Sequence, residues 1–259
     1  MNGLQRVAHI VHMKIALVLY GQPRDYERGY AVISAYLKAV DVDVFYHCWT
    51  LKDAETFASA PWRSIDPKTL RYTSSAPDRL LELYTPVAHA YELQTEETLV
   101  GVAYKDTYAF ANTFGQKRDN ARNALFQMYS RTKARHLFAA HVASSGTHYD
   151  AVLTTRFDIG RMPTIPLGSL DLTKTYVSDI HRPRHILPDN CIVAPPQVYL
   201  DWFTIYDDLP VLLNDKTLAR EVRSLGEQFE INAEELLFMQ YIARFGMLRD
   251  IRTFPGGTL

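Results

Sequence analysis

Two short apolar runs near the N-terminus, separated by a segment with helical spacing, constrain the fold most. Residues 14–20 (KIALVLY) form a continuous apolar run that Gly21 ends, and VDVFYHCW (42–49) is a second such run. Continuous apolar runs are typical of strands buried on both faces of a parallel sheet. Asp25 can cap a helix between them. The apolar side chains of that helix recur near helical spacing: Tyr30, Ile33, Leu37 and Val40. The order predicts a βαβ unit.

The strongest helix signal covers residues 116–144, which contain neither proline nor glycine and are rich in Ala, Leu, Met, Arg and Lys. This composition predicts one long helix, which Gly146 ends. The run YDAVLTT (149–155) follows as a third buried strand and leads into Arg156-Phe157-Asp158. A second βαβ-type step is therefore expected, which places the chain in the α/β class.

The second half predicts further, shorter elements. YVSDI (176–180) and NCIVA (190–194) are expected to be strands on either side of a basic loop, HRPRH (181–185). Pro195 and Pro196 should open a helix that runs to about Asp208. Asn232, followed three residues later by Glu235, is a capping-box pattern and starts a last helix to about Phe245.

Prolines interrupt residues 51–115, for which we expect short helices, a strand and loops. No linker divides the chain, so residues 13–259 are interpreted as a single domain. Residues 1–12 precede the first strand and are interpreted as an N-terminal extension.

Composition excludes several classes of protein. The chain has 259 residues, 47% of them hydrophobic, which is enough for a full core. Its 28 basic and 29 acidic residues give a net charge of −1, so a nucleic-acid partner is disfavoured. Cys48 and Cys191 lie in apolar runs far apart, as expected of buried thiols in a reducing compartment. No apolar run is long enough for a transmembrane segment, and a cytoplasmic location is expected.

Ligands of open α/β sheets bind beyond the carboxyl ends of the strands, so the polar residues there are the candidate site. Three places qualify: Gly21-Gln22-Pro23-Arg24, Arg156-Phe157-Asp158, and Asp189-Asn190. Asp158 could hold a divalent cation that neutralises a pyrophosphate, with Arg156 adding positive charge. The alternative is that Arg156 and Asp158 only pair with each other.

Other polar residues are open to two readings. Gly21 and Arg24 could approach a phosphate, or form an ordinary turn with a solvated arginine. The basic loop 181–185 could close over a diphosphate or be only solvated. A stripe of uncharged polar residues on the long helix could face sugar hydroxyls, with Tyr129 and Lys133 nearby, or form a structural network. The stripe consists of Gln116, Asn120, Asn123, Gln127 and Ser130.

A carboxylate at the mouth of the site could accept the proton of an acceptor hydroxyl, and the candidates are Asp189, Glu234 and Glu235. For Glu235 the capping role is the competing explanation. His47, inside the second strand, is interpreted as a packed residue rather than a base.

Taken in order, these segments resemble a glycosyltransferase-like family found in capsule, surface-polysaccharide and large-virus glycosylation loci. The matching segments are GQPR, DVFYHCW, QMYSRTKA, YDAVLTTRFD, DNCIVAPP and AEELLFMQYI. The resemblance implies a GT-A-like (Rossmann-like) fold with a mixed, mostly parallel sheet flanked by helices. It also implies a nucleotide-diphosphate sugar as donor and a glycan hydroxyl as acceptor.

In this interpretation the donor contacts Gly21, Gln22, Arg24, Ser130, Lys133, Arg156 and Asp158. Asp158 replaces the usual two-acid metal motif and would hold Mn²⁺ or Mg²⁺. Two alternatives remain: a non-catalytic nucleotide- or glycan-binding protein on the same fold, and a sugar-nucleotide nucleotidyltransferase. The second is disfavoured because its glycine-rich loop is reduced here to Gly21. Neither G-x-G-x-x-G nor G-x-x-x-x-G-K-[ST] occurs.

Overall fold

The structure is a computed structural model of the chain. It describes residues 13–52, 73–99, 106–107, 109, 118–178, 187–224, 232–246 and 250–255. The expected extension (1–12) and the basic loop 181–185 lie outside these residues.

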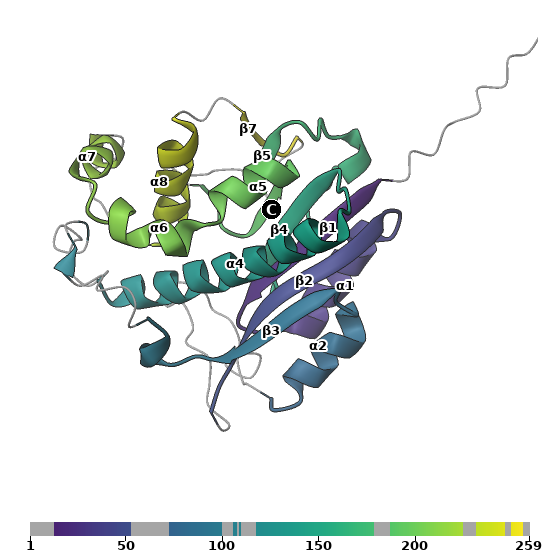
Figure 1. Cartoon of the computed structure of the whole chain (residues 1–259). Coiled ribbons are helices and arrows are strands. Elements are labelled where there is room, and N and C mark those ends of the chain that lie inside the picture. Colours follow the sequence, from purple (N-terminus) through teal and green to yellow (C-terminus); the bar gives the residue numbers. More distant parts are fainter. Residues whose placement is uncertain are drawn as a thin grey trace, which may run out of the picture.

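A seven-stranded sheet forms the centre of the described part of the chain, in the order β3-β2-β1-β4-β6-β5-β7 (Figure 1). Four neighbouring strands, β3, β2, β1 and β4, are parallel, whereas β6 is antiparallel to both β4 and β5. The strands are β1 (Lys14–Gly21), β2 (Asp41–Thr50), β3 (Ala88–Leu93), β4 (Ala151–Arg156), β5 (Thr175–Val177), β6 (Cys191–Ala194) and β7 (Ile251–Thr253). The expected α/β class, with a mixed and mostly parallel sheet, is confirmed.

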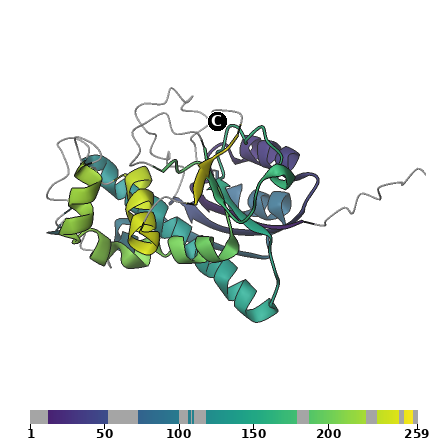
Figure 2. The same ribbon diagram turned by 90° about the horizontal axis from the view of Figure 1, so that it is seen from above.

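Helices cover both faces of the sheet, with α1 and α2 on one side and α4 on the other (Figure 2). The helices are α1 (Tyr26–Leu37), α2 (Ala76–Tyr84), α4 (Arg118–Ser145), α5 (Pro196–Trp202), α6 (Ile205–Leu212), α7 (Lys216–Ser224) and α8 (Ala233–Phe245). Alternate residues of β1 enter the two cores: Ala16 and Val18 face α4, and Ile15 and Leu17 face α1. This two-sided burial explains why β1 reads as a continuous apolar run.

The helix expected from Pro196 to about Asp208 is interrupted, which corrects that prediction. It divides into α5 and α6 at Phe203 and Thr204. Thr132 of α4 satisfies the backbone at the break. Its hydroxyl donates to the Phe203 carbonyl at 3.0 Å and accepts from the Tyr206 amide at 3.1 Å. A residue distant in the sequence therefore replaces the hydrogen bonds that the helix loses at the break. The local sequence alone does not predict this break.

The caps of two helices differ from one another. Asp25 lies at the N-cap of α1 but adopts a left-handed conformation, and its side chain makes no capping bond, contrary to expectation. Asn232 does cap α8, because its Oδ1 accepts from the Glu235 amide at 2.8 Å. The capping-box prediction is thus correct for the hydrogen bond that the Asn232 side chain accepts.

We expect Asn232→Ala to lower the free energy of unfolding by about 1 kcal/mol, the usual value of an N-cap hydrogen bond. Ser75→Ala is the matched control, since Ser75 is the N-cap of α2 and makes no side-chain capping bond. Urea unfolding of both variants measures the difference. Equal losses would show that the Asn232 bond contributes nothing.

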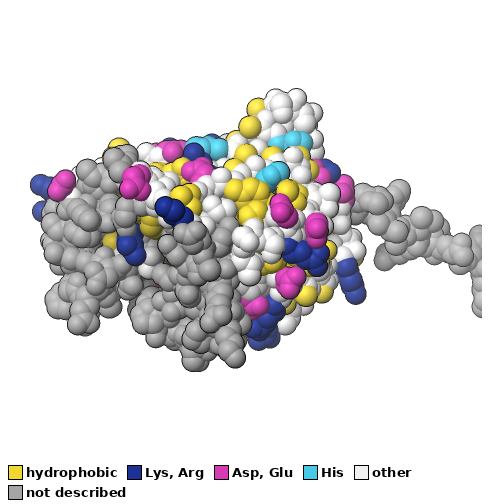
Figure 3. All heavy atoms as spheres, turned by 90° about the horizontal axis from the view of Figure 1, so that it is seen from below, with side chains coloured by type: hydrophobic (Ala, Val, Ile, Leu, Met, Phe, Trp, Pro, Cys, Tyr) yellow, Lys and Arg dark blue, Asp and Glu magenta, His cyan; other side chains and the backbone are white. Residues whose placement is uncertain are grey.

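The surface carries no single sign of charge where it can be seen. Over the described part of the face in Figure 3, acidic and basic side chains are interspersed. Cys48 and Cys191 are both buried and free. Among the described helices, none combines the length and apolar character that a membrane span requires.

Candidate functional site

The four parallel strands end at one edge of the sheet, and polar side chains gather there. β1 ends at Gly21 and leads to Arg24, while β4 ends at Arg156 and leads to Asp158. β6 runs antiparallel to β4, with Cys191 opposite Thr155, so Asp189 also lies at this edge. We call Arg24, Arg131, Arg156, Asp158 and Asp189 the strand-end cluster.

Asp158 lies between two arginines. Its Oδ1 is 2.8 Å from Nε of Arg156, and its Oδ2 is 3.0 Å from Nη2 of Arg24. The side chain of Asp158 is only 8% exposed. The ion pair considered from the sequence is therefore present, and Arg24 adds a second cation to it.

Arg156 connects the two carboxylates of the cluster. Besides Asp158, its Nη1 lies 3.7 Å from Oδ2 of Asp189. Burial alone would lower the pKa of Arg156, but the neighbouring Asp158 and Asp189 carboxylates raise it above its ordinary value. Arg156 is a permanent positive charge at the end of β4.

Asp189 is fixed through both its side chain and its backbone. Gln127 of α4 donates to the carboxylate at 2.6 Å. The backbone carbonyl accepts from the Tyr20 hydroxyl and from Arg131. Side chains from β1, β4 and α4 thus hold this residue just before β6.

Arg131 was not among the sequence candidates. It is 1% exposed, its guanidinium lies 3.9 Å from the centroid of the Tyr20 ring, and it donates to the Tyr20 hydroxyl. Burial lowers its pKa below the ordinary value. In the sequence Arg131 is one of several basic residues on a long helix. Its guanidinium packs against the ring of Tyr20, which is over one hundred positions away in the sequence.

Gly29 of α1 allows the helix to approach the site backbone. A Cβ at this position would lie 1.7 Å from the carbonyl oxygen of Phe157. Only glycine permits such an approach. The position of Phe157, and of Asp158 next to it, therefore depends on a residue in the preceding βαβ unit.

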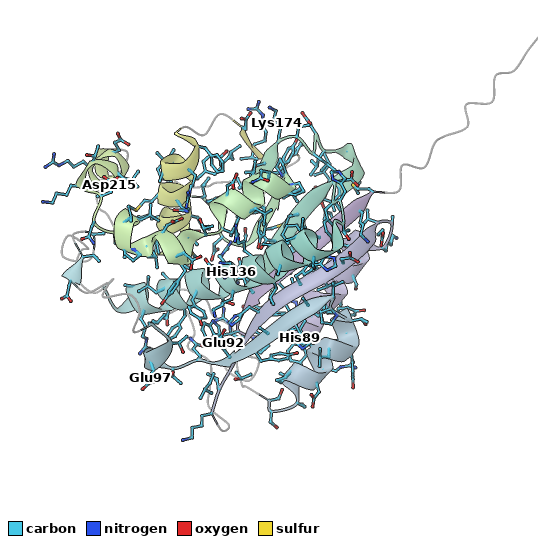
Figure 4. All side chains as sticks on the ribbon, in the orientation of Figure 1. His89, Glu92, Glu97, His136, Lys174 and Asp215 are labelled. Carbon is cyan, nitrogen blue, oxygen red and sulfur yellow. The ribbon has the colours of Figure 1, made fainter. Side chains whose placement is uncertain are left out.

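A second group of polar residues lies where the ends of β2 and β3 meet α4. We call His47, Glu92, Tyr129 and Lys133 the Glu92 cluster. The Tyr129 hydroxyl donates to Oε2 of Glu92 at 2.6 Å. Nε2 of His47 and Nζ of Lys133 each lie 3.4 Å from Oε1. Figure 4 shows Glu92 between β3 and α4.

The charges of this second cluster are well defined. The nearby His47 imidazole, followed by the Tyr129 hydroxyl and the Lys133 ammonium, lowers the pKa of Glu92 to about 2 against the opposing effect of burial. Burial lowers the pKa of His47 below its ordinary value, despite the nearby Glu92 carboxylate. Glu92 is therefore a carboxylate, and His47 is neutral, at neutral pH.

The turn after β1 contacts the Glu92 cluster as well. Gly21 has φ 101°, as a sharp turn requires, and its amide donates to Oγ of Ser130 at 2.8 Å. Ser130 in turn lies 2.8 Å from Nδ1 of His47. The side chain of Gln22 donates to Gln94 at 2.7 Å, just beyond β3. One turn thus joins the ends of β1, β2 and β3.

The polar stripe on α4 proves to be divided. Gln127 and Ser130 reach the two clusters, whereas Asn123 is exposed. Gln116 and the side chain of Asn120 lie outside the described residues. His47 is fully buried in β2, as expected of a packed residue.

Glu234 and Glu235 open α8 and are placed differently from Asp189. The backbone carbonyl of Glu234 accepts from the Leu187 amide at 3.3 Å, which ties α8 to the segment before Asp189. Glu235 is 3% exposed and its amide serves the N-cap. Among contacts between described residues, Asp189 is the one of the three acids that joins the strand-end cluster.

The surroundings of Asp158 do not fit a divalent cation. Each of its oxygens faces a guanidinium group, so a cation there would meet two positive charges at close range. Within the described ranges, no group of three or more His, Cys, Asp and Glu side chains could hold a metal ion. The arrangement suits an anion beside the arginines better.

No protein-family model matches the chain. No curated protein matches it either. Among solved structures, the chain is similar to the galactosyltransferase LgtC in complex with donor and acceptor sugar analogs, with 11% identity and a TM-score of 0.41. That likeness covers 93% of this chain and 73% of LgtC. An active-site mutant of LgtC gives 10% identity and a TM-score of 0.39, covering 93% and 72%. A similarity this weak does not show what the chain does. The function has to be inferred from the side chains of the site.

Proposed function

We propose that the protein is a glycosyltransferase that moves a sugar from a nucleotide-diphosphate donor to a hydroxyl of a glycan acceptor. The observation that carries the proposal is the strand-end cluster, whose three guanidinium groups and two carboxylates come from the ends of β1 and β4, from α4 and from the segment before β6. From β1 the chain continues to β2 and β3 on one side of the sheet and to β4 on the other. The strand order therefore changes direction between β1 and β4, next to this cluster. Ligands of α/β sheets bind at such a point.

The charge of the cluster supports a diphosphate ligand. The three arginines exceed the carboxylates Asp158 and Asp189 by one positive charge. Arg131 is 1% exposed and adds only its charge, whereas the guanidinium groups of Arg24 and Arg156 supply the strong paired hydrogen bonds that phosphate oxygens accept. The carboxylates hold Arg24 and Arg156 in place before a ligand arrives. Preorganised positive charge of this kind stabilises a leaving group as its negative charge develops.

The proposed reaction breaks the bond between the anomeric carbon and the diphosphate oxygen. The acceptor hydroxyl forms the new bond to the anomeric carbon and gives its proton to the Asp189 carboxylate, while the diphosphate leaves with the bonding electrons. Arg24 and Arg156 counter the charge on the diphosphate. The sequence predicts that Mn²⁺ or Mg²⁺ at Asp158 neutralises the diphosphate. Because both oxygens of Asp158 contact arginines, we propose instead that Arg24 and Arg156 neutralise the charge of the diphosphate.

We assign Asp189 to the reacting sugar, in preference to Glu234 and Glu235. Support comes from its place in the cluster and from the way Gln127, Tyr20 and Arg131 fix it. A carboxylate fixed in this way can accept hydrogen bonds from hydroxyl groups near the anomeric carbon.

Calorimetric titration with uridine, guanosine, cytidine, thymidine and adenosine diphosphates, with and without Mn²⁺, tests donor binding. We expect at least one of them to bind, and to do so without Mn²⁺ because arginines supply the charge. Binding by none of them in either condition would falsify the proposal. Slow release of free sugar from the matching nucleotide sugar, lost in Asp158→Ala, is expected of an enzyme and not of a glycan-binding protein.

A further inference from the structure

We propose that the Glu92 cluster binds a vicinal diol, the pair of neighbouring hydroxyl groups that a sugar ring presents. The inference rests on the proposed function and extends it to a second subsite, at the ends of β2 and β3. Nothing in the sequence motifs singled out Glu92.

The cluster has unused hydrogen-bonding capacity. A carboxylate has about four acceptor positions, and the Tyr129 hydroxyl takes one at 2.6 Å. The His47 and Lys133 nitrogens, both at 3.4 Å, lie beyond ordinary hydrogen-bond distance. Nε2 of His47 is fully buried, points at Glu92, and has no hydrogen-bond partner among the described residues. The hydrogen bonding of the cluster is therefore incomplete as it stands.

The cluster is also accessible. The side chains of Glu92 and Lys133 are 31% and 41% exposed. Tyr129 is held firmly behind them, because its ring stacks on Trp49 with centroids 5.2 Å apart. The Glu92 carboxylate, which Tyr129 holds, and the Lys133 ammonium therefore lie side by side and are both partly open to solvent.

The chemistry of the cluster selects the class of ligand. The Glu92 carboxylate would repel a phosphate, and a divalent cation would require more acidic ligands than one. A neutral ligand with both O–H donors and oxygen acceptors fits. One hydroxyl donates to Glu92 while its neighbour accepts from the Lys133 ammonium. Since a carboxylate with a pKa of about 2 is a weak base, Glu92 binds hydroxyls rather than removing their protons.

The Glu92 cluster and the strand-end cluster share the turn after β1. On one side of the turn, Gly21 connects to His47 through Ser130. The next residue, Gln22, connects to Gln94 beyond β3. On the other side, Arg24 pairs with Asp158 of the strand-end cluster. A ligand whose phosphates contact Arg24 therefore has this diol subsite beside it. The diol belongs either to the ribose of the donor or to a sugar ring of the acceptor.

Two sets of probes distinguish these sources. Uridine and guanosine diphosphates and their 2′,3′-dideoxy analogues are titrated calorimetrically into the wild type, Glu92→Gln and Lys133→Met. Methyl glycosides of glucose, galactose and mannose are tested by saturation-transfer NMR on the same proteins.

If the ribose is the source, Glu92→Gln weakens binding of the parent nucleotide about tenfold, as expected for a hydrogen bond to a charged group, and leaves binding of the dideoxy analogue unchanged. If an acceptor sugar is the source, the glycosides lose their signal instead. In either case Lys133→Met lowers binding of the same probe.

Glu97→Gln is the matched control, because Glu97 is an exposed carboxylate five residues beyond Glu92 (Figure 4). It should leave all affinities unchanged, and thermal melting of each variant confirms that it is folded. The subsite is rejected if Glu92→Gln leaves every diol-bearing probe unaffected, or weakens the dideoxy nucleotides as much as their parents. Failure of all nucleoside diphosphates contradicts the donor assignment alone, since the glycosides still test the subsite. If the wild type binds neither set, both proposals are overturned.

Discussion

Replacing Arg156 by methionine is expected to raise the Kd of the bound nucleoside diphosphate at least about tenfold, since a hydrogen bond to a charged group contributes about 1.5–3 kcal/mol. The substitution removes the cation that faces both Asp158 and Asp189. Without this cation, the negative charges of the two carboxylates would repel the phosphates. Calorimetric titration of the variant measures the loss.

Two further variants sharpen this result. Arg161→Met removes an exposed arginine five positions along the chain, and its Kd should equal that of the wild type. Arg156→Lys keeps the charge but loses the planar, multidentate geometry, so an intermediate loss is expected. A Kd that does not change in Arg156→Met would place the diphosphate elsewhere.

A second large effect is expected from Gly29→Ala, which should lower the free energy of unfolding by at least about 2 kcal/mol through overpacking. The added methyl group would meet the Phe157 carbonyl oxygen at 1.7 Å. Glycine to alanine in a helix normally stabilises, so a net loss reports the steric conflict. Because Phe157 is adjacent to Asp158, nucleotide affinity should fall too.

Gly168→Ala provides the comparison, since a Cβ there meets no atom within 4 Å. Urea unfolding and calorimetry on both variants separate the steric effect from any general effect of losing a glycine. A Gly29→Ala protein as stable as the wild type would mean that α1 can move away from Phe157 at little cost.

The sequence predicts those elements whose signal is local. The strands β1, β2 and β4 and the helix α4 were all expected within a few residues, because uninterrupted apolar runs and a proline-free segment report directly on burial and helix formation. The short strand β7 and the division between α5 and α6 were not. Their hydrogen bonds come from residues distant in the sequence, such as Thr132 at Phe203.

The candidate site was predictable to the extent that its residues follow recognised strands. Arg24, Arg156, Asp158 and Asp189 were selected on that ground, and the structure brings them together. Glu92 could have been found by the same rule if β3 had been assigned, since it lies one residue from the end of that strand. Arg131 could not, because its role depends on the ring of Tyr20.

The helix α4 has a consequence for how ligands would influence each other. Gln127 and Arg131 contact Asp189, while Tyr129 and Lys133 contact Glu92. These four residues span less than two turns of one helix, which rises about 1.5 Å per residue. If a ligand at one cluster shifts this part of α4, the residues that contact the other cluster shift with it. Two ligands bound there would therefore be thermodynamically linked, each changing the affinity of the other by the same factor.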